Sequence, residues 1–371
     1  MRHSISVSGR ELEVAVVDSK EEFGALRGVW KDVLSASVTD SGFTTWEWLY
    51  TWSERFIAGE RRLFVLVVFD GSEVIGIAPW YIQRVARSGV PVREIGFLGL
   101  PEAGSDYLDV IAKAAKEPLV AQALHSVLFG TLASHWDTIG LKEIPAESAF
   151  LAHFISELRR HGKYYETDEG SFCPGVRLPD SFEAYLHQLS SHSRHAYRRK
   201  MRALLSNEGV RHVVRRGAHE VQCALPALKQ LYQMRWAGDG DDLFALLASY
   251  LPRAEDAWQV EASLLTVRER PVAGLLHLTN GKKMYQYLMA VDRSFNRRIS
   301  IGSLICGINI QAAIEAGCVE YDFLRGMEDH KLKFMNRARR SMNVSVHNKT
   351  LRSLSAWTIG AARHFGKLLL R

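Results

Sequence analysis

The hydrophobic positions of the chain fall into short strand-like runs and longer helical repeats that occur twice in the same order. Residues 63–69 form a continuous apolar run, an Asp-Gly turn follows it, and residues 74–78 form a second run. Residues 262–267 and 272–276 repeat this arrangement in the second half of the chain. Apolar runs of this length joined by a short turn are typical of β-hairpins. The pattern therefore predicts one hairpin in each half.

Each predicted hairpin leads, through further strand material, to a helix and a closing strand. Apolar residues recur at helical spacing over 119–132 and 303–316, and strand-like runs follow at 136–141 and 319–324. We expect both helices to be amphipathic. The order of hairpin, strand, helix and strand, found twice, predicts an α+β protein with two copies of one domain. Each copy would be a mixed, mostly antiparallel sheet flanked by helices.

A polar stretch at 166–171 separates the two copies. We therefore place the first domain over 1–170 and the second over 171–345, followed by a basic amphipathic tail over 346–371. The composition supports two folded domains, because 47% of the 371 residues are hydrophobic and 24% are charged. Such a composition excludes a disordered chain.

The net positive charge of the chain lies at its C-terminal end. Lys and Arg number 47 against 41 Asp and Glu, which gives a net charge of +6. Residues 331–371 carry ten Lys or Arg and no Asp or Glu, so the rest of the chain carries −4. A nucleic-acid-binding body would carry basic residues across a folded face. We therefore expect no nucleic acid partner.

The sequence contains neither a membrane-spanning pattern nor a metal-binding pattern. No apolar stretch approaches the roughly 20 residues that cross a bilayer, and no apolar signal segment follows the first residues. The four cysteines lie far apart, without a C-x-x-C pair or a zinc-ligand spacing. We expect a cytoplasmic protein that uses no metal.

The sharpest local signal for chemistry is a turn over 297–302, just before the helix predicted from Ser303. Small residues at 300 and 302 allow a bulky ligand to approach the backbone, and the free N–H groups of a helix N-terminus favour an anion. This arrangement fits a diphosphate. The predicted cofactor-binding residues are Arg297, Arg298, Ile299, Ser300, Ile301, Gly302 and Ser303.

The turn resembles the R/Q-x-x-G-x-G/A turn with which GNAT acyltransferases bind the pyrophosphate of coenzyme A, with Ser300 in place of the first glycine. A tyrosine-rich strand at 284–290 precedes it, and the motif D-x-x-x-G-x-E-x-H-K at 322–331 follows the helix. With a basic helix over 193–207 and the phrase GSDYLD at 104–109, this order resembles the CelD/BcsL-type acetyltransferases. That GNAT branch is connected with cellulose and exopolysaccharide biosynthesis. The resemblance implies two tandem GNAT-like domains.

The resemblance also implies an activity. An acyl group, typically acetyl, would pass from acyl-coenzyme A to an amine or hydroxyl by direct attack in a ternary complex. The expected acceptor is an amino sugar, a saccharide precursor or a similar polar metabolite. Asp322, Glu328 or a water chain would act as general base, and His330, where the family usually has Tyr, would protonate the departing thiolate. The alternatives are that Asp322 caps its strand or pairs with Arg325, and that Glu328 and His330 are surface residues.

The first copy has no equivalent of the turn, so we expect only the second copy to bind coenzyme A and the first to help form the acceptor cleft. The basic helix would contact the adenosine phosphate, select an anionic acceptor or form a solvated face, since Arg194 and Arg198 share one side of it. The alternative for Asp106 and Tyr107 is a capping and turn cluster. The predicted substrate-binding residues are Asp106, Tyr107, Arg194, Arg198, Tyr287, Arg325 and Lys331.

Two other functions stay open. The CelD/BcsL-type family is itself similar to the Fem-type aminoacyltransferases, which implies aminoacyl transfer from tRNA. A degenerate GNAT-like protein would instead be a non-catalytic partner in a polysaccharide-assembly complex. In the tail, the helical spacing of Leu354, Trp357 and Phe365 predicts a helix that packs back onto the protein or lies on an anionic membrane.

Overall fold

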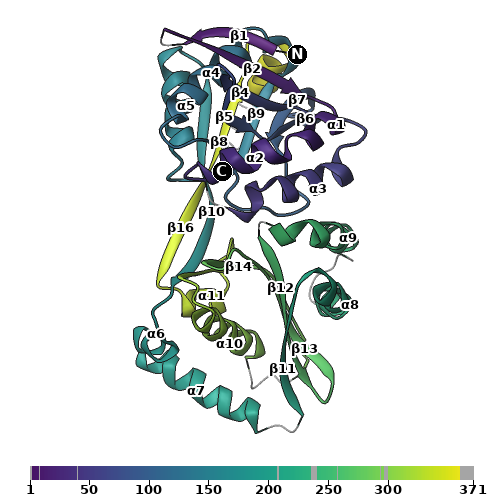
Figure 1. Ribbon diagram of the computed structural model, residues 1–371, viewed down its shortest axis with the longest axis vertical. Coiled ribbons are helices and arrows are strands. Elements are labelled where there is room, and N and C mark those ends of the chain that lie inside the picture. The colour runs from purple at the N-terminus through teal and green to yellow at the C-terminus, as the bar shows by residue number, and fades with distance from the viewer. Residues whose placement is uncertain are drawn as a thin grey trace, which may run out of the picture. The chain divides into compact units, whose positions relative to one another are not determined.

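The computed structural model describes residues 2–7, 9–39, 41–206, 209–234, 240–256, 258–292, 294–295 and 300–359 (Figure 1). The chain divides into two compact units. Unit 1 comprises Met1–Gly170 and Ser341–Arg371, and unit 2 comprises Ser171–Arg340. Residues 341–345, which we assigned to the second domain, therefore group with unit 1. Among the described helices, none is long and apolar enough to cross a membrane.

Unit 1 contains two groups of hydrogen-bonded strands. One group, in spatial order, is β1 (Arg2–Val7), β2 (Arg10–Val17), β4 (Val65–Asp70), β5 (Glu73–Ala78) and β8 (Ile111–Ala112). The other is β16 (Arg337–His347), β9 (Thr138–Pro145), β7 (Val90–Phe97), β6 (Trp80–Arg87) and β3 (Arg61–Leu63). The helices are α1 (Lys20–Ala25), α2 (Arg27–Ser35), α3 (Trp46–Phe56), α4 (Glu117–Phe129) and α5 (Ala149–Arg160), with the 3-10 turns η1 (Gly42–Thr44) and η2 (Ala133–His135).

The first predicted hairpin is formed by β4 and β5, which pair antiparallel about the Asp70-Gly71 turn. The predicted strand 63–69 is wrong in one respect, because it is two strands. β3 pairs with β6, whereas β4 pairs with β2 and β5. The change of partner occurs at Phe64, whose N–H donates to the carbonyl of Trp80 at 3.0 Å.

Unit 2 has one sheet, in the order β11 (Val210–Arg216), β12 (Gln259–Val267), β13 (Arg270–Thr279), β14 (Lys283–Val291), β15 (Glu320–Asp322) and β10 (Tyr165–Arg177). Strands β10 and β16 each begin in one unit and end in the other. The helices are α6 (Phe182–Gln188), α7 (Ser191–Leu205), α8 (Ala218–Gln233), α9 (Asp241–Tyr250), α10 (Ile301–Glu315) and α11 (Asp329–Phe334), with the 3-10 turn η3 (Leu251–Asp256).

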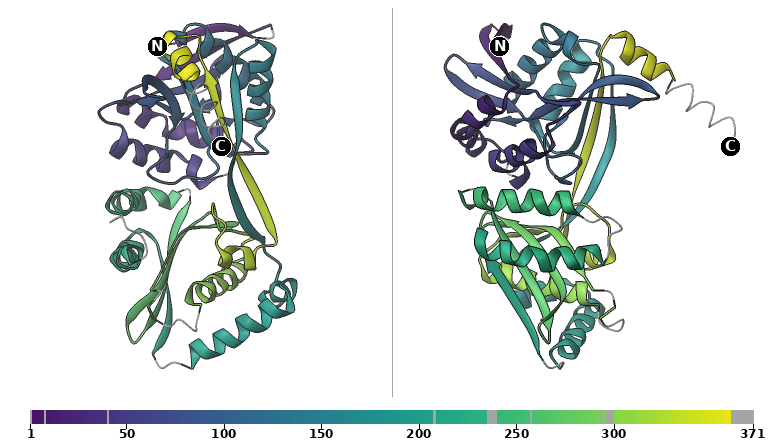
Figure 2. Two further views of the ribbon diagram at one scale, coloured as in Figure 1. Left: turned by 180° about the vertical axis from the view of Figure 1, so that it is seen from behind. Right: turned by 90° about the vertical axis from the view of Figure 1, so that its right-hand side faces the viewer.

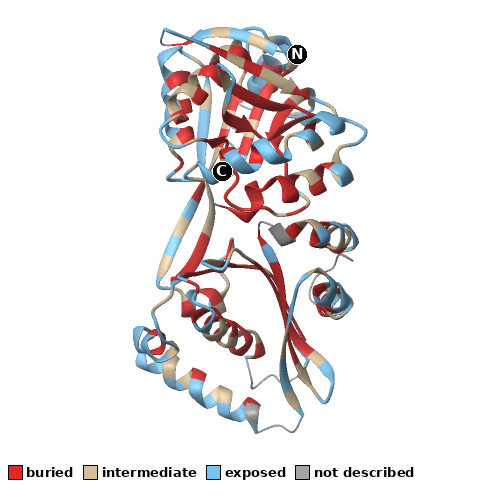
Figure 3. Ribbon diagram, viewed as in Figure 1, coloured by how far each residue is buried: buried red, intermediate tan, exposed pale blue. Residues whose placement is uncertain are grey.

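Helices α8 and α10 cover opposite faces of this sheet (Figure 1). Gly274 on β13 marks the α8 face, because a Cβ at this position would overlap the side chain of Leu228. The core on the other face joins Leu275 to α10 residues such as Leu304 and Ile310, all fully buried. Figure 3 shows the central strands and α10 as buried.

The expectation that α10 is amphipathic is wrong. The helix starts at Ile301, two residues before the predicted start, and buries apolar side chains on most of its circumference. The reason is that α6, α7 and α11 pack against it on the side away from the sheet (Figure 2). Tyr197 of α7 fits against Gly307 so closely that a Cβ at 307 would overlap the tyrosine ring.

Candidate active site

Strand β14 separates from β15 partway along its length. The two strands pair in parallel only over Lys283–Tyr285, opposite Glu320–Asp322. On its other edge β14 pairs with β13 along the whole strand, with a bulge at Tyr287, since Leu276 pairs with Leu288 and His277 with Gln286. The half of β14 after Tyr285 therefore has one edge outside the β15 ladder, where backbone amides can serve a ligand.

The N-terminus of α10 lies beside this half of β14. The first intrahelical hydrogen bond runs from Leu304 N–H to the carbonyl of Ser300 at 3.1 Å, so the N–H groups of 301–303 have no acceptor within the helix. A Cβ at Gly302 would lie 3.7 Å from Met289 Cε and 3.7 Å from Val291 Cγ1, both on β14. Among the described residues, packing thus permits a larger residue at 302, and no contact there requires glycine.

The predicted cofactor turn is described only from Ser300 onward. Arg297, Arg298 and Ile299 lie outside the described residues. Ser300 is exposed and its Oγ lies 2.9 Å from Ser303 Oγ, while Ile301 is buried.

Asp322, a predicted base, is buried and bound through both carboxylate oxygens. Its Oδ1 accepts the N–H of Leu324 at 2.7 Å, and its Oδ2 accepts from Arg339 Nη1 at 2.9 Å. Arg339 also pairs with Glu320, which in turn pairs with Arg337 at 3.3 Å. Asp322 thus pairs with Arg339, on β16, and accepts a backbone N–H just after its strand, as the capping alternative expects. These contacts favour a structural task, which is to fix the chain as it leaves β15.

Glu328 and Lys331 form a compact cluster around Gly326. Lys331, a predicted substrate contact, is buried, and its Nζ lies 3.2 Å from Glu328 Oε2 and donates to the carbonyl of Arg325 at 2.5 Å. Gly326 has a φ of +124° and donates its N–H to Phe172 at 3.0 Å. A Cβ at 326 would displace the ends of the Glu328 and Lys331 side chains, and the φ of +124° is one that L residues rarely adopt, so this position favours glycine.

The pKa of Glu328 is lowered although the group is partly buried. Burial acts to raise this pKa, but the charge of Lys331, hydrogen bonding and the nearby His330 outweigh it. Glu328 is therefore a carboxylate at neutral pH, and its side chain is 38% exposed. His330 is half-buried in the first turn of α11, two residues from Glu328.

The other predicted substrate contacts lie in different settings. Arg198 pairs with Glu183 on α6, and Arg194 Nη1 lies 3.3 Å from His187 Nδ1 on the same helix. The shared face of these two arginines therefore meets α6. Tyr287 and Arg325 are half-buried in unit 2, whereas Asp106 and Tyr107 are buried within unit 1.

Sequence reasoning missed a buried polar network behind β14. His277 Nε2 lies 2.9 Å from the Tyr321 hydroxyl, which donates to Gln286 Oε1 at 2.9 Å. Cys306 Sγ on α10 donates to the same oxygen at 3.3 Å. Burial lowers the pKa of His277 to about 3 and raises that of Cys306 to about 12. Both groups are therefore neutral, and the network links β13, β14, β15 and α10.

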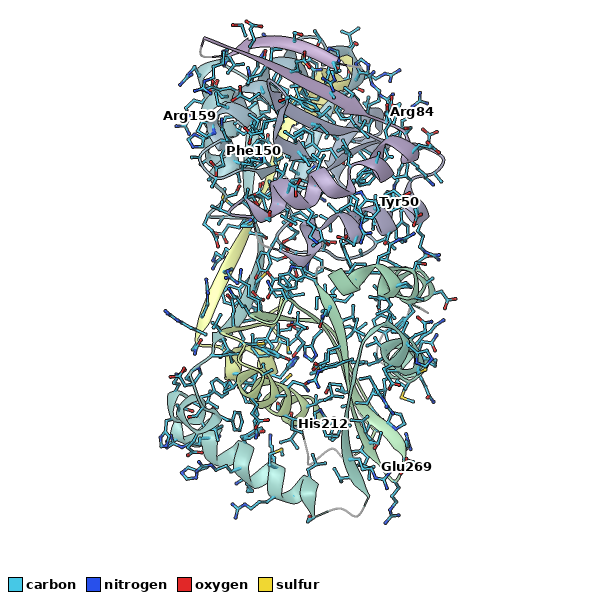
Figure 4. The ribbon with its side chains drawn as sticks, in the orientation of Figure 1. Tyr50, Arg84, Phe150, Arg159, His212 and Glu269 are labelled. Atoms are coloured by element: carbon cyan, nitrogen blue, oxygen red, sulfur yellow. The ribbon has the colours of Figure 1, made fainter. Side chains whose placement is uncertain are left out.

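The sequence signal for this network is a polar residue within each of two apolar strands, His277 in β13 and Gln286 in β14. Their pairing depends on the bulge at Tyr287, which no local pattern indicates. A second histidine, His212 on the edge strand β11, is labelled in Figure 4, and its Nε2 lies 2.8 Å from Ser263 Oγ. Within the described residues, no group of three His, Cys, Asp or Glu side chains could hold a metal ion.

Comparison with known proteins identifies the fold. Residues 191–332 match a family model described as an acetyltransferase (GNAT) domain. Among curated proteins, none matches the chain by sequence. FemX matches with a TM-score of 0.58 and 13% identity, covering 92% of this chain and 99% of that one. A tandem GNAT protein from the clavulanic acid biosynthesis pathway matches with a TM-score of 0.51 and 12% identity, over 90% of this chain and 98% of that one.

A third similar structure is the C-terminal domain of a putative lysylphosphatidylglycerol synthetase from Agrobacterium fabrum. Its TM-score is 0.52 at 12% identity, and the match covers 91% of this chain and 95% of that domain. At these identities the likeness establishes the fold alone. The protein has an α+β, tandem GNAT fold, which confirms the fold class predicted from the sequence, and the match to the GNAT acetyltransferase domain model lies in its second half.

Proposed function

We propose that the protein transfers an acyl group from acyl-coenzyme A to an amine or hydroxyl of a polar acceptor, with the coenzyme bound by unit 2. The observation that carries this proposal is the position of the α10 N-terminus beside the half of β14 that lies outside the β15 ladder. The α10 N-terminus would supply backbone amides for the diphosphate, and β14 would supply backbone amides for the thioester carbonyl.

The residues fit an anionic coenzyme. Three N–H groups at the start of α10 have no intrahelical acceptor, and the helix dipole favours negative charge at this end. Gly302 has no side chain that could block a ligand. The nearest described side chains, Met289 and Val291, would lie 3.7 Å from an added Cβ and so do not occupy its position. Arg297 and Arg298 precede the helix in sequence and would add positive charge to the site.

The chemistry requires little more than positioning. The acceptor nitrogen or oxygen attacks the thioester carbonyl carbon, the C–S bond breaks, and the acceptor proton passes to a base while the thiolate gains a proton. Holding the two reactants together lowers the barrier by about 7–11 kcal/mol, and a general base adds about 10²–10⁴-fold. Amides of β14 would stabilise the oxyanion as charge develops.

Among the predicted acid–base residues, Glu328 has the properties of a base. It is ionised and partly exposed, whereas both oxygens of Asp322 are engaged. His330 lies in the same turn and is the candidate acid for the departing thiolate. A saccharide precursor of exopolysaccharide synthesis is the acceptor class that the CelD/BcsL-type resemblance favours, with the reaction taking place in the cytoplasm and without a metal.

One observation favours a second candidate. The match to FemX covers nearly the whole chain, and the Fem-type aminoacyltransferases are the group to which the CelD/BcsL-type acetyltransferases are similar. The two candidates differ in their donor. The −4 charge of the chain before residue 331 favours coenzyme A, because a tRNA donor needs a basic surface.

A donor competition separates the two candidates. The full chain would be titrated with acetyl-coenzyme A by calorimetry, and in parallel with tRNA by fluorescence anisotropy at two salt concentrations. Saturable binding of acetyl-coenzyme A, with tRNA binding weak, supports the proposal. Saturable, strongly salt-dependent tRNA binding without any coenzyme binding overturns it in favour of the aminoacyl-tRNA candidate.

A further inference from the structure

Unit 1 contains a pocket of about 660 Å³ that belongs to none of the predicted site residues. Its lining comes from the end of α4, from residues 162–164, and from residues 347–357 at the C-terminal end of the described chain. The volume lies in the range of small-molecule sites, which are about 300–1,000 Å³. The pocket is built within unit 1 and does not depend on the proposed acyl transfer.

The wall of the pocket is aromatic and apolar. Phe129, Tyr164, Leu354 and Trp357 all contribute to it. The Trp357 indole N–H donates to the Tyr164 hydroxyl at 3.0 Å, and the two rings meet edge-on with centroids 5.5 Å apart. Leu354 is 50% exposed and Trp357 is 42% exposed, so these large side chains lie at the surface without a covering element among the described residues.

Hydrogen bonds hold the segments around the pocket in place. The buried Asn348 amide donates to the carbonyls of Ala133 at 2.7 Å and Trp136 at 2.9 Å. Thr350 Oγ1 accepts the N–H of Ser353 at 3.1 Å and so caps the helix over 351–359. That helix packs with its small residues inward, because Ser353 and Ala356 are buried while the larger apolar residues face out.

The pocket carries positive charge without a matching carboxylate. Lys163 and Lys349 both line it, and no Asp or Glu belongs to the described lining. Neither ammonium has an ion-pair partner within the described chain, and Lys163 Nζ lies 4.2 Å from the centroid of the Phe129 ring. The pKa of Lys163 is lowered by burial and by the charge of Lys349. A bound anion would remove this repulsion.

Two carboxylates lie near the pocket without belonging to its described lining. Glu166 accepts from the Tyr164 hydroxyl at 2.5 Å, and Asp137 pairs with Arg93 at 3.0 Å. Burial is the main cause of a lowered pKa for His347, on the pocket wall, so its imidazole is neutral at neutral pH. Among the described lining residues, the charged side chains at neutral pH are therefore Lys163 and Lys349.

We propose that this pocket binds an apolar carboxylate, an aryl or medium-chain acyl acid. The hydrocarbon would lie against Phe129, Leu354 and Trp357, and the carboxylate would meet Lys163 and Lys349. Burial of the hydrocarbon would supply most of the affinity, and the two ammonium groups would select the anion over a neutral analogue.

The test is calorimetric titration of the full chain with decanoate, below micelle-forming concentrations, and with decanol as the neutral analogue. We expect one saturable site for decanoate and about tenfold weaker binding of decanol. The variant Lys163→Met/Lys349→Met should bind decanoate about tenfold more weakly. Its matched control is Lys31→Met/Lys142→Met, which changes two exposed lysines of unit 1 outside the pocket and should bind as the parent does.

A second variant tests the apolar wall without disturbing the core. Leu354→Glu places a carboxylate at a half-exposed position of the pocket, so folding should be retained and decanoate binding lost. The proposal is overturned if decanoate shows no saturable binding, if decanol binds as tightly as decanoate, or if Leu354→Glu binds decanoate like the parent protein.

Discussion

The buried carboxylate of Asp322 forms an ion pair with the partly exposed Arg339, with 2.9 Å between Oδ2 and Nη1. The pair connects the end of β15 to β16. It bears on whether Asp322, the first residue of the D-x-x-x-G-x-E-x-H-K motif, is a general base or a structural residue. A general base must be able to give up its contacts to receive a proton. Asp322 accepts from a guanidinium and from a backbone N–H, so its contacts favour stability over proton transfer.

We therefore expect that replacing Asp322 or Arg339 mainly lowers the free energy of unfolding of unit 2 and has little effect on the rate of acyl transfer. We expect Asp322→Asn to lower the free energy of unfolding by about 1–3 kcal/mol, and Arg339→Met, which leaves a buried carboxylate unpaired, to lower it by about 3–5 kcal/mol. Urea denaturation measures both. A stable Asp322→Asn protein with a rate reduced a hundredfold would instead identify Asp322 as the base.

Gly326 should be intolerant of a side chain. Gly326→Ala places a Cβ against Glu328 Oε2 and Lys331 Nζ at a φ of +124°, and we expect a loss of about 1–3 kcal/mol in the free energy of unfolding. Gly281→Ala is the control, since Gly281 has a φ of +81° but no atom within 4 Å of the added Cβ. Thermal denaturation measures the loss of stability in both variants. Equal losses would mean that the contacts with Glu328 and Lys331 add nothing to the cost of the backbone strain.

The pH dependence of the reaction should reflect the lowered pKa of Glu328. Burial opposes the shift, but the Lys331 charge prevails, so the base form is present above a pKa that lies below the ordinary 4.5. We expect kcat/KM to be free of a Glu328 limb between pH 5 and 7, and Glu328→Gln to reduce kcat by about 10²–10⁴-fold at every pH in that window. An unchanged kcat in Glu328→Gln would remove this residue from the mechanism.

The stability of unit 1 should fall as the pH rises, because of one buried carboxyl. Burial raises the pKa of Asp109 from 3.8 to about 7, against hydrogen bonds that include the Val110 N–H at 2.8 Å. Folded protein therefore binds a proton that unfolded protein has lost, and this stabilisation is full below pH 3.8 and lost as the pH rises to about 7.

Comparison with Asp109→Asn isolates this effect. The free energy of unfolding of the parent protein, measured relative to this variant, should decrease by up to about 4 kcal/mol between pH 4 and pH 8. A difference between the two proteins that does not change with pH would contradict the assignment.

The parts of the fold that depend on local sequence were predictable. Both hairpins and the helical repeat that becomes most of α10 follow from apolar periodicity. The character of α10 was not predictable, because its outer face is covered by helices distant in sequence. The same reason applies to Arg194 and Arg198, whose partners lie on α6.

The candidate site was also predictable only in part. The small residues before α10 and the motif around Gly326 are visible as letters in the sequence. The roles within the motif are not, because the partner of Asp322 comes from β16 and the partner of Glu328 depends on a left-handed glycine. The network of His277, Gln286 and Tyr321 depends on a strand bulge and on three separate strands.

The measurement that tests the central claim most directly compares acetyl-coenzyme A binding by Gly302→Glu and Val319→Glu. Each variant adds one negative charge to unit 2. Position 302 is in the first turn of α10, where a Cβ fits, and position 319 is exposed near the other end of that helix.

We predict that the parent protein and Val319→Glu bind acetyl-coenzyme A with equal, micromolar affinity, and that Gly302→Glu loses binding by at least about a hundredfold, or about 2.8 kcal/mol. Equal binding by both variants would mean that the coenzyme does not lie at the start of α10. Absence of binding in the parent protein itself would contradict acyl transfer from coenzyme A.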